Sequence, residues 1–173
     1  MSERADGIVI TGDVYGSSEP DGGSVDAFDA FLACAADICP VYIVAGENDP
    51  AEGLVFTGSI MRQQEVFVSG PSATEVVMIR TEDEFGPLVM QMLPSDAASA
   101  SVRCVPDPDT GVRNVLIGRR RPVGRGTEAV SRNDRGTGLR RGETGPTIVS
   151  LVRLDGNGAT AVEEAEPSRS LCP

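Results

Sequence analysis

Two short apolar runs separated by one amphipathic segment decide the fold. Residues 7–13 read GIVITGD, and residues 40–50 read PVYIVAGENDP. β-Branched residues bounded by glycine, proline and aspartate are typical of short buried strands. The sequence therefore predicts buried strands at 8–10 and 41–44.

The segment between these runs predicts a helix. Its apolar residues recur at spacings of 3, 3, 1 and 3, which places them along one helical face: Val25, Phe28, Phe31, Leu32 and Ala35. Ser24 is the expected N-cap, Asp26 is expected in the first turn, and Pro40 should end the helix. A strand, a helix and a strand of these lengths form a βαβ unit, so the two strands should be adjacent and parallel and should end at the same sheet edge.

Weaker signals follow residue 50, and together they predict one α/β domain over residues 1–163. Short strands are expected at 66–68, 76–80, 102–105 and 115–117, and a short helix at 82–93. Residues 147–154 and 159–163, joined by the sequence DGNG, predict a C-terminal β-hairpin. Residues 164–173 should form a disordered tail.

Composition places the chain among globular proteins. It has 173 residues, 40% of them hydrophobic, and no apolar run approaches the roughly 18 residues that cross a bilayer. The start MSERADG lacks the basic and then apolar pattern of a signal peptide, so we expect a cytoplasmic protein without membrane contact. In that compartment the four cysteines should be thiols.

The charge balance indicates an environment of concentrated salt. The net charge is -11, the sequence contains no lysine, and only 4% of residues are aromatic. Acidic surfaces keep proteins soluble where salt screens charges over about 3 Å. We therefore expect a halophilic source.

Salt dependence follows from this charge and can be measured. Weak screening leaves the acidic body repelling itself, so the melting temperature should rise from dilute buffer to molar KCl. A melting temperature that stays constant over this range would contradict the halophilic interpretation.

Arginine is concentrated in an Arg/Gly-rich region, residues 113–141, which holds nine of the fifteen arginines. Most of this region lacks hydrophobic periodicity, so from residue 118 onward we expect a long loop. It could pair with the acidic body, or Arg119, Arg120 and Arg121 could bind phosphate groups of a small ligand or a nucleic acid.

The absence of histidine excludes several kinds of catalysis. Ser-His-Asp and Cys-His relays and histidine-ligated zinc all require an imidazole within the chain. A bound metal would have to be held by oxygen or sulfur.

Oxygen ligands do follow both predicted parallel strands. Asp13 comes directly after the first strand, and Glu47, Asn48 and Asp49 come shortly after the second. Open α/β sheets place ligands at this edge, and Mg²⁺, Mn²⁺ and Ca²⁺ prefer such oxygens. The alternative is a pair of turns in which these side chains bond their own backbone.

Residues 6–50 resemble the early part of a calcineurin-like metallophosphoesterase. In that family an apolar strand ends in G-D, a helix follows, and the motif P-V-Y-x-V-x-G-N-H-D-P closes the next strand. The resemblance implies an α/β sandwich with parallel central strands and Mg²⁺ or Mn²⁺ at the strand ends. It implies that Asp13 matches the metal-bridging carboxylate, that Glu47 replaces a metal-binding Asn, and that Asn48 replaces the catalytic His.

The sequence also differs from the family pattern at defined positions. The D-x-H strand that opens the family is missing, and residues 115–122, VLIGRRRP, resemble the last family strand with arginine where histidine is expected. A metal pair activates hydroxide only with a nearly complete ligand set. We therefore expect a degenerate, non-catalytic or weakly active metallophosphoesterase-like protein. The alternatives are an active phosphoesterase using Asp13 and Glu47, or an unrelated soluble α/β binding protein.

Overall fold

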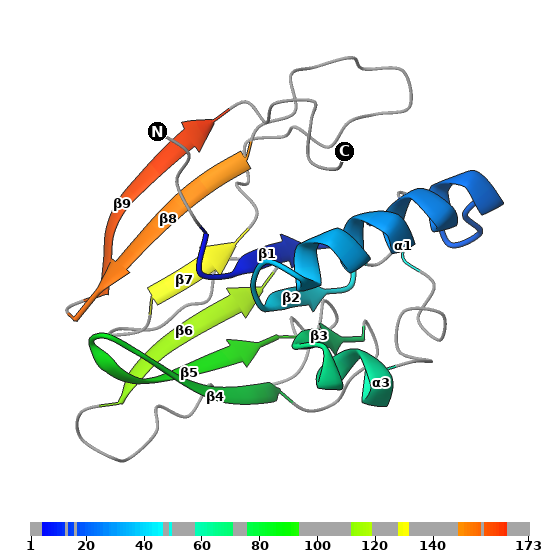
Figure 1. The fold of residues 1–173 in the computed structure, drawn as a ribbon. Helices are drawn as coiled ribbons and strands as arrows, with labels where there is room; N and C mark the ends of the chain where they lie inside the picture. Colours follow the sequence, from blue (N-terminus) through cyan, green and yellow to red (C-terminus); the bar gives the residue numbers. More distant parts are fainter. Residues whose placement is uncertain are drawn as a thin grey trace.

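The protein is a mixed α/β chain, and its described residues form three small sheets (Figure 1). The computed structural model describes residues 5–12, 14–15, 17–46, 49, 58–70, 76–93, 112–118, 128–131, 149–156 and 158–165. The strand predicted at 102–105 lies outside these residues.

The first sheet contains three parallel strands in the order β1-β2-β3. Its elements along the chain are β1 (Ile8–Thr11), α1 (Gly22–Ala36), β2 (Val41–Val44), α3 (Gly58–Gln63) and β3 (Val66–Ser69). Ile8 lies beside Val41, which confirms the predicted adjacent, parallel pair. The prediction that both strands are buried is correct for β2 and wrong for β1, whose residues are only half-buried because β1 is an edge strand.

Helix α1 begins earlier than the sequence analysis predicted. Asp21 is the N-cap in place of Ser24, and its carboxylate accepts hydrogen bonds from the Ser24 amide and the Ser24 hydroxyl, both at 2.9 Å. These hydrogen bonds lower the pKa of Asp21, the bond from the backbone amide most strongly. Asp26 consequently lies beyond the first turn.

The second sheet contains β4 (Val77–Asp83), β5 (Gly86–Met92), β6 (Arg113–Gly118) and β7 (Glu128–Ser131) in that order. The helix predicted at 82–93 is wrong, because β4 and β5 form an antiparallel hairpin there, with Gly86 at φ 100° after the turn. The prediction of an uninterrupted loop after residue 118 is also wrong, because β7 pairs with β6 in parallel.

The third sheet is the predicted C-terminal hairpin, formed by β8 (Val149–Asp155) and β9 (Gly158–Ala165). β9 ends at Ala165, so the first two residues of the predicted tail belong to a strand.

Two hydrophobic clusters lie on the two faces of the first sheet. One joins Tyr42 and Val44 of β2 to Met90 and Met92 of β5 and to Ile117 of β6. The other packs α1 against Val41 and Ile43. Phe28 and Phe31 take part in the second cluster but are only partly buried, so substituting either should cost less than the roughly 3–5 kcal/mol of a fully buried ring.

Glu65 connects α3 to β3 in a left-handed conformation, with φ 57°. It is the only non-glycine residue with positive φ among those described. Its carbonyl accepts a hydrogen bond from the Val41 amide at 3.0 Å, so the conformation helps to position the start of β2.

Replacing Glu65 with glycine should stabilise the protein. A left-handed conformation costs an L-residue about 1–2 kcal/mol, and glycine loses about 0.5–1 kcal/mol in entropy, so Glu65→Gly should gain about 0.5–1 kcal/mol in chemical denaturation. Gln64→Gly, at the preceding position, should destabilise. Equal effects of the two substitutions would contradict this account.

The prediction that all four cysteines are thiols is wrong for Cys34. Cys34 is disulfide-bonded, whereas Cys39 is a buried thiol. Within the described ranges, no helix combines the length and the apolar character needed to span a bilayer.

Candidate functional site

The structure describes only part of the predicted metal site. Asp49 is described, whereas Asp13, Glu47 and Asn48 lie outside the described residues, as do Arg119, Arg120 and Arg121. The description does include the backbone on either side of the predicted ligands, at Gly12, Val14, Tyr15 and Gly46.

Asp49 is almost completely buried, with 3% of its surface exposed. Its Oδ2 accepts a hydrogen bond from the Gly46 amide at 2.7 Å, and its Oδ1 accepts one from the Tyr15 amide at 3.1 Å. One carboxylate therefore ties the loop after β1 to the loop after β2.

This connection joins described backbone that is close in sequence to the predicted ligands. Asp13 is two residues before Tyr15, and Glu47 directly follows Gly46. Because both amides bind the same carboxylate, the two loops approach each other at the carboxyl edge of the parallel strands. The proximity predicted from the βαβ unit therefore holds for the loop backbones flanking the ligands.

Asp49 itself acts as a backbone acceptor in this structure. The bond from the Gly46 amide matches the alternative that turn side chains bond their own backbone, whereas the bond from the Tyr15 amide reaches the other loop. No three Asp, Glu or Cys side chains gather into a metal-binding group within the described parts of the chain.

Two further residues belong to this edge and were missed by sequence reasoning. The ring of Tyr15 packs edge-on against Phe28, with 5.5 Å between centroids. Burial, followed by the charges of Asp49 and Asp29, raises the pKa of Tyr15.

Ser69 ends β3, and its carbonyl accepts a hydrogen bond from the Ala45 amide at 3.0 Å. Ser69 Oγ is fully buried without a hydrogen-bond partner in the described structure, and no sequence signal marks it.

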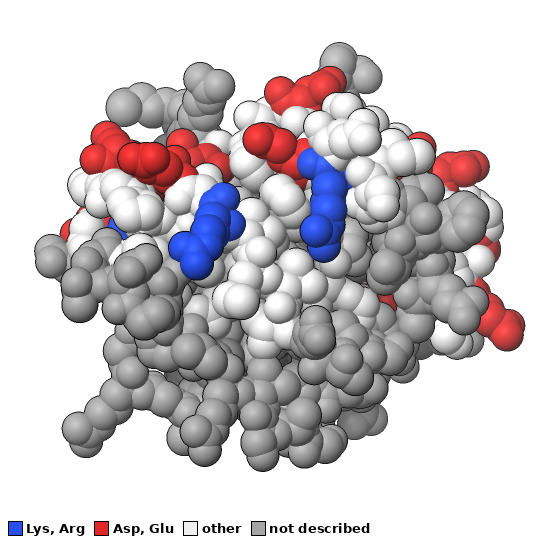
Figure 2. Space-filling model, turned by 90° about the horizontal axis from the view of Figure 1, so that it is seen from below, with Lys and Arg blue, Asp and Glu red and all other residues white. Residues whose placement is uncertain are grey.

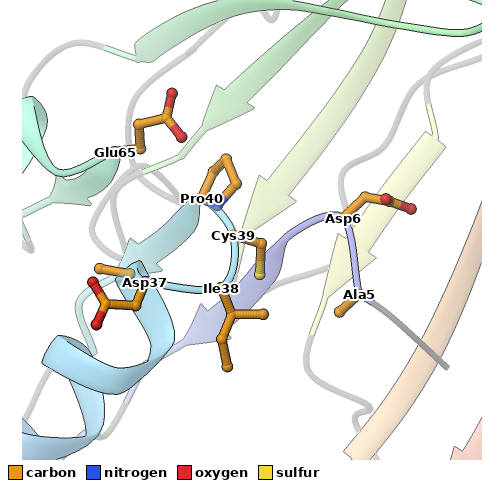
Figure 3. A pocket seen from close by; sticks show the side chains of 8 residues that line it. Ala5, Asp6, Asp37, Ile38, Cys39, Pro40 and Glu65 are labelled. Carbon is orange, nitrogen blue, oxygen red and sulfur yellow. The ribbon is translucent and has the colours of Figure 1, made fainter. Parts of the chain in front are cut away.

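A shallow pocket lies at the opposite edge, where the parallel strands begin. Its volume is about 430 Å³, and its lining includes Asp6, Asp37, Ile38, Cys39 and Glu65. Figure 3 shows the three carboxylates pointing in different directions, while the Cys39 sulfur points between Ile38 and Ala5. A single cation could not be held by all three carboxylates in this arrangement.

Tyr42 lies near this pocket in the core, and burial, followed by the charges of Glu65 and Cys39, raises its pKa above 10.0. A raised pKa in the folded state means that the neutral phenol is favoured by folding. Its contribution to stability is complete below pH 10 and is lost as the pH rises through the folded pKa.

Alkaline titration of ultraviolet absorbance checks this assignment, because the chain has two tyrosines and no tryptophan. Both phenols should ionise later in the folded protein than in denaturant, since the pKa of Tyr15 is also raised. The variant Tyr42→Phe leaves the Tyr15 signal alone and assigns the two steps. Ionisation of both phenols at their ordinary pKa in folded protein would contradict this account.

Neither a scan against protein-family models nor a search of curated proteins finds a match for this chain.

Proposed function

We propose that the protein is a degenerate metallophosphoesterase-like module that binds a divalent cation weakly at the carboxyl edge of β1 and β2 and does not hydrolyse phosphoesters efficiently. The observation that carries this proposal is the buried Asp49 carboxylate, which accepts the amides of Tyr15 and Gly46. In the sequence, Asp13 is two residues before Tyr15, and Glu47 and Asn48 follow Gly46. Mg²⁺ or Mn²⁺ suits a set of carboxylate and amide oxygens.

Weak binding follows from the small number of ligands. Asp49 already accepts two amides, which leaves Asp13, Glu47 and Asn48 as the side chains proposed to contact the cation. Three oxygen ligands without histidine favour one cation that keeps several water molecules. A single hydrated cation cannot stabilise both the attacking and the leaving oxygen of a phosphoryl transfer, as a pair of metal ions does.

The proposal includes an α/β sandwich built on the parallel strands. Two features support it: α1 packs on one face of the first sheet, and side chains of β5 and β6 pack on the other. In Figure 1 the arrows of β1 and β6 point toward the same side. Because residues 119–121 follow β6 directly, we propose that these arginines bind a phosphate-bearing ligand or a nucleic acid near the cation.

Titration with Mn²⁺ in molar KCl tests the cation site, because a bound paramagnetic ion broadens nearby amide resonances. The amides of Gly12 and Ala45 should broaden at millimolar metal. Asp13→Asn should abolish the effect, whereas Asp26→Asn, an equal charge change at an exposed position on α1, should not. Absence of broadening in the unmodified protein would refute the cation site.

Hydrolysis of an aryl phosphodiester tests the absence of efficient catalysis. We expect the rate with Mn²⁺ to equal that of the Asp13→Ala variant. A rate that is clearly higher and is lost in Asp13→Ala would replace the proposal with an active phosphoesterase.

A further inference from the structure

One hydroxyl at the carboxyl edge of the first sheet is enclosed without a hydrogen bond. Ser69, the last residue of β3, has no exposed surface, and its Oγ has no hydrogen-bond partner in the described structure. Its backbone carbonyl is bonded, because it accepts the Ala45 amide at 3.0 Å. A buried hydroxyl gives up its hydrogen bonds to water, so an unpartnered one destabilises the fold. This unfavourable group lies at the edge where open α/β sheets bind ligands.

The register of the first sheet shows which face this hydroxyl occupies. Val66 and Val68 pack in the cluster that holds α1, whereas Phe67 packs in the cluster shared with β5 and β6. Side chains alternate between the two faces along a strand, so Ser69 shares the face of Phe67. Ser69 also lies beside Val44, which belongs to that same cluster. Ser69 Oγ is therefore on the face of the first sheet that turns toward the second sheet.

The loop connection made by Asp49 lies toward the other face. Tyr15, whose amide bonds to Asp49, packs its ring against Phe28 of α1. Val14 belongs to the cluster that holds α1. The edge therefore offers the loops of the proposed cation site toward α1 and the Ser69 hydroxyl toward the second sheet. In Figure 1 the arrows of β1 and β6 point toward the same side, and residues 119–121 follow β6 in the sequence.

A phosphate group is the ligand whose chemistry matches this hydroxyl. A hydroxyl donates to an anionic oxygen, and hydrogen bonds to charged groups are the strong ones. On the face shown in Figure 2, the described basic side chains lie apart from one another on a largely uncharged surface bordered by acidic residues. The described part of that face therefore offers a phosphate no converging basic donors. The edge at Ser69 offers a buried donor whose hydrogen bond is still to be made.

We propose that Ser69 Oγ donates a hydrogen bond to the terminal phosphate of a small ligand, bound at the carboxyl edge on the face of the first sheet that turns toward the second. This inference rests on the proposed function and names the ligand class of its phosphate site. Because the hydroxyl is enclosed in the free protein, the phosphate oxygen must take the place of atoms that now cover it. A terminal phosphate has one substituent and can place an oxygen there, whereas a phosphodiester carries a substituent on either side.

The stability of Ser69→Ala tests whether the hydroxyl lacks a partner within the protein. The variant removes an unsatisfied buried group, so the denaturation midpoint in molar KCl without phosphate should rise. Ser59→Ala makes the same change at an exposed position on α3 and should leave the midpoint unchanged. A midpoint that falls in Ser69→Ala would show that the hydroxyl already has a structural partner, and it would overturn the proposal.

Titration with inorganic phosphate in the presence of Mg²⁺ measures the contact itself. The amide resonances of Ser69 and Ala45 should shift in the unmodified protein and equally in Ser59→Ala. The affinity for phosphate should fall roughly tenfold to a hundredfold in Ser69→Ala, because a hydrogen bond to a charged group is lost. Equal affinities of the unmodified protein and Ser69→Ala, or no shift in either, would overturn the proposal. Dimethyl phosphate should bind more weakly than inorganic phosphate, and equal binding of the two would exclude a terminal phosphate.

Broadening by Mn²⁺ distinguishes failure of this inference from failure of the proposed function. Ser69→Ala retains Asp49 and the proposed cation ligands, so the Gly12 and Ala45 amides should still broaden. Broadening that persists while phosphate affinity is independent of Ser69 would overturn the hydroxyl contact alone. Phosphate binding that requires Ser69 in a protein without Mn²⁺ broadening would support the hydroxyl contact and refute the cation site.

Discussion

Ile43→Ala should lower the free energy of unfolding by about 2–5 kcal/mol, the range for deleting a large aliphatic side chain from a packed core. Ile43 has no exposed surface and lies in the central strand β2, between β1 and β3. Its side chain belongs to the cluster that holds α1 on the first sheet. The deletion would leave a cavity that two neighbouring strands and a helix must close together.

Denaturant titration in molar KCl measures this cost, and Ile60→Ala provides the matched control. Ile60 lies on α3 with 66% of its surface exposed, so the same chemical change should alter stability by less than about 0.5 kcal/mol. Similar losses for the two variants would show that Ile43 does not occupy a packed core.

The parts of the fold that were predictable from the sequence are those with a local signal. The apolar runs at 8–10 and 41–44, with one amphipathic helix between them, determined the parallel pair. The sequence DGNG between two strand-like runs determined the hairpin of β8 and β9. In both cases the two strands that pair are neighbours in the sequence, and the segment that connects them has a recognisable pattern of its own.

The errors arose where distant contacts decide the structure. β1 is half-buried because it lies at a sheet edge, and its apolar run does not reveal its position in the strand order. Residues 88–92 are all buried, because β5 lies in the middle of a sheet. Their sequence therefore lacks the alternation of a half-buried strand, and from the sequence alone such a segment cannot be distinguished from a buried helix. Strand β7 has no periodic pattern and depends on pairing with β6.

For the candidate site, the structure and the sequence analysis agree on the place of one described residue, Asp49. Sequence reasoning placed Asp49 at the carboxyl edge of the sheet, and the structure places it there. It did not predict that this carboxylate would also accept the amide of Tyr15, because Tyr15 is 34 residues away in sequence. Such a long-range hydrogen bond has no local pattern.

Asp49→Asn should therefore destabilise the protein and weaken the proposed cation site together. An amide side chain replaces one acceptor oxygen with a donor, so one of the two backbone N–H groups loses its partner in a buried position. Such a loss costs about 1–3 kcal/mol. The freed loop should also show faster hydrogen exchange at the Tyr15 or Gly46 amide.

Two control variants show whether Asp49→Asn acts by releasing the two loops or only by removing a negative charge. Asp26→Asn removes the same charge from the exposed surface of α1 and should leave both stability and Mn²⁺ broadening nearly unchanged. Asp13→Asn should abolish the broadening and leave the Tyr15 and Gly46 amides protected, because the Asp49 carboxylate is intact. If Asp49→Asn leaves the unfolding free energy and both amide protections unchanged, Asp49 does not hold the loops together, and the observation that carries the proposed function is lost.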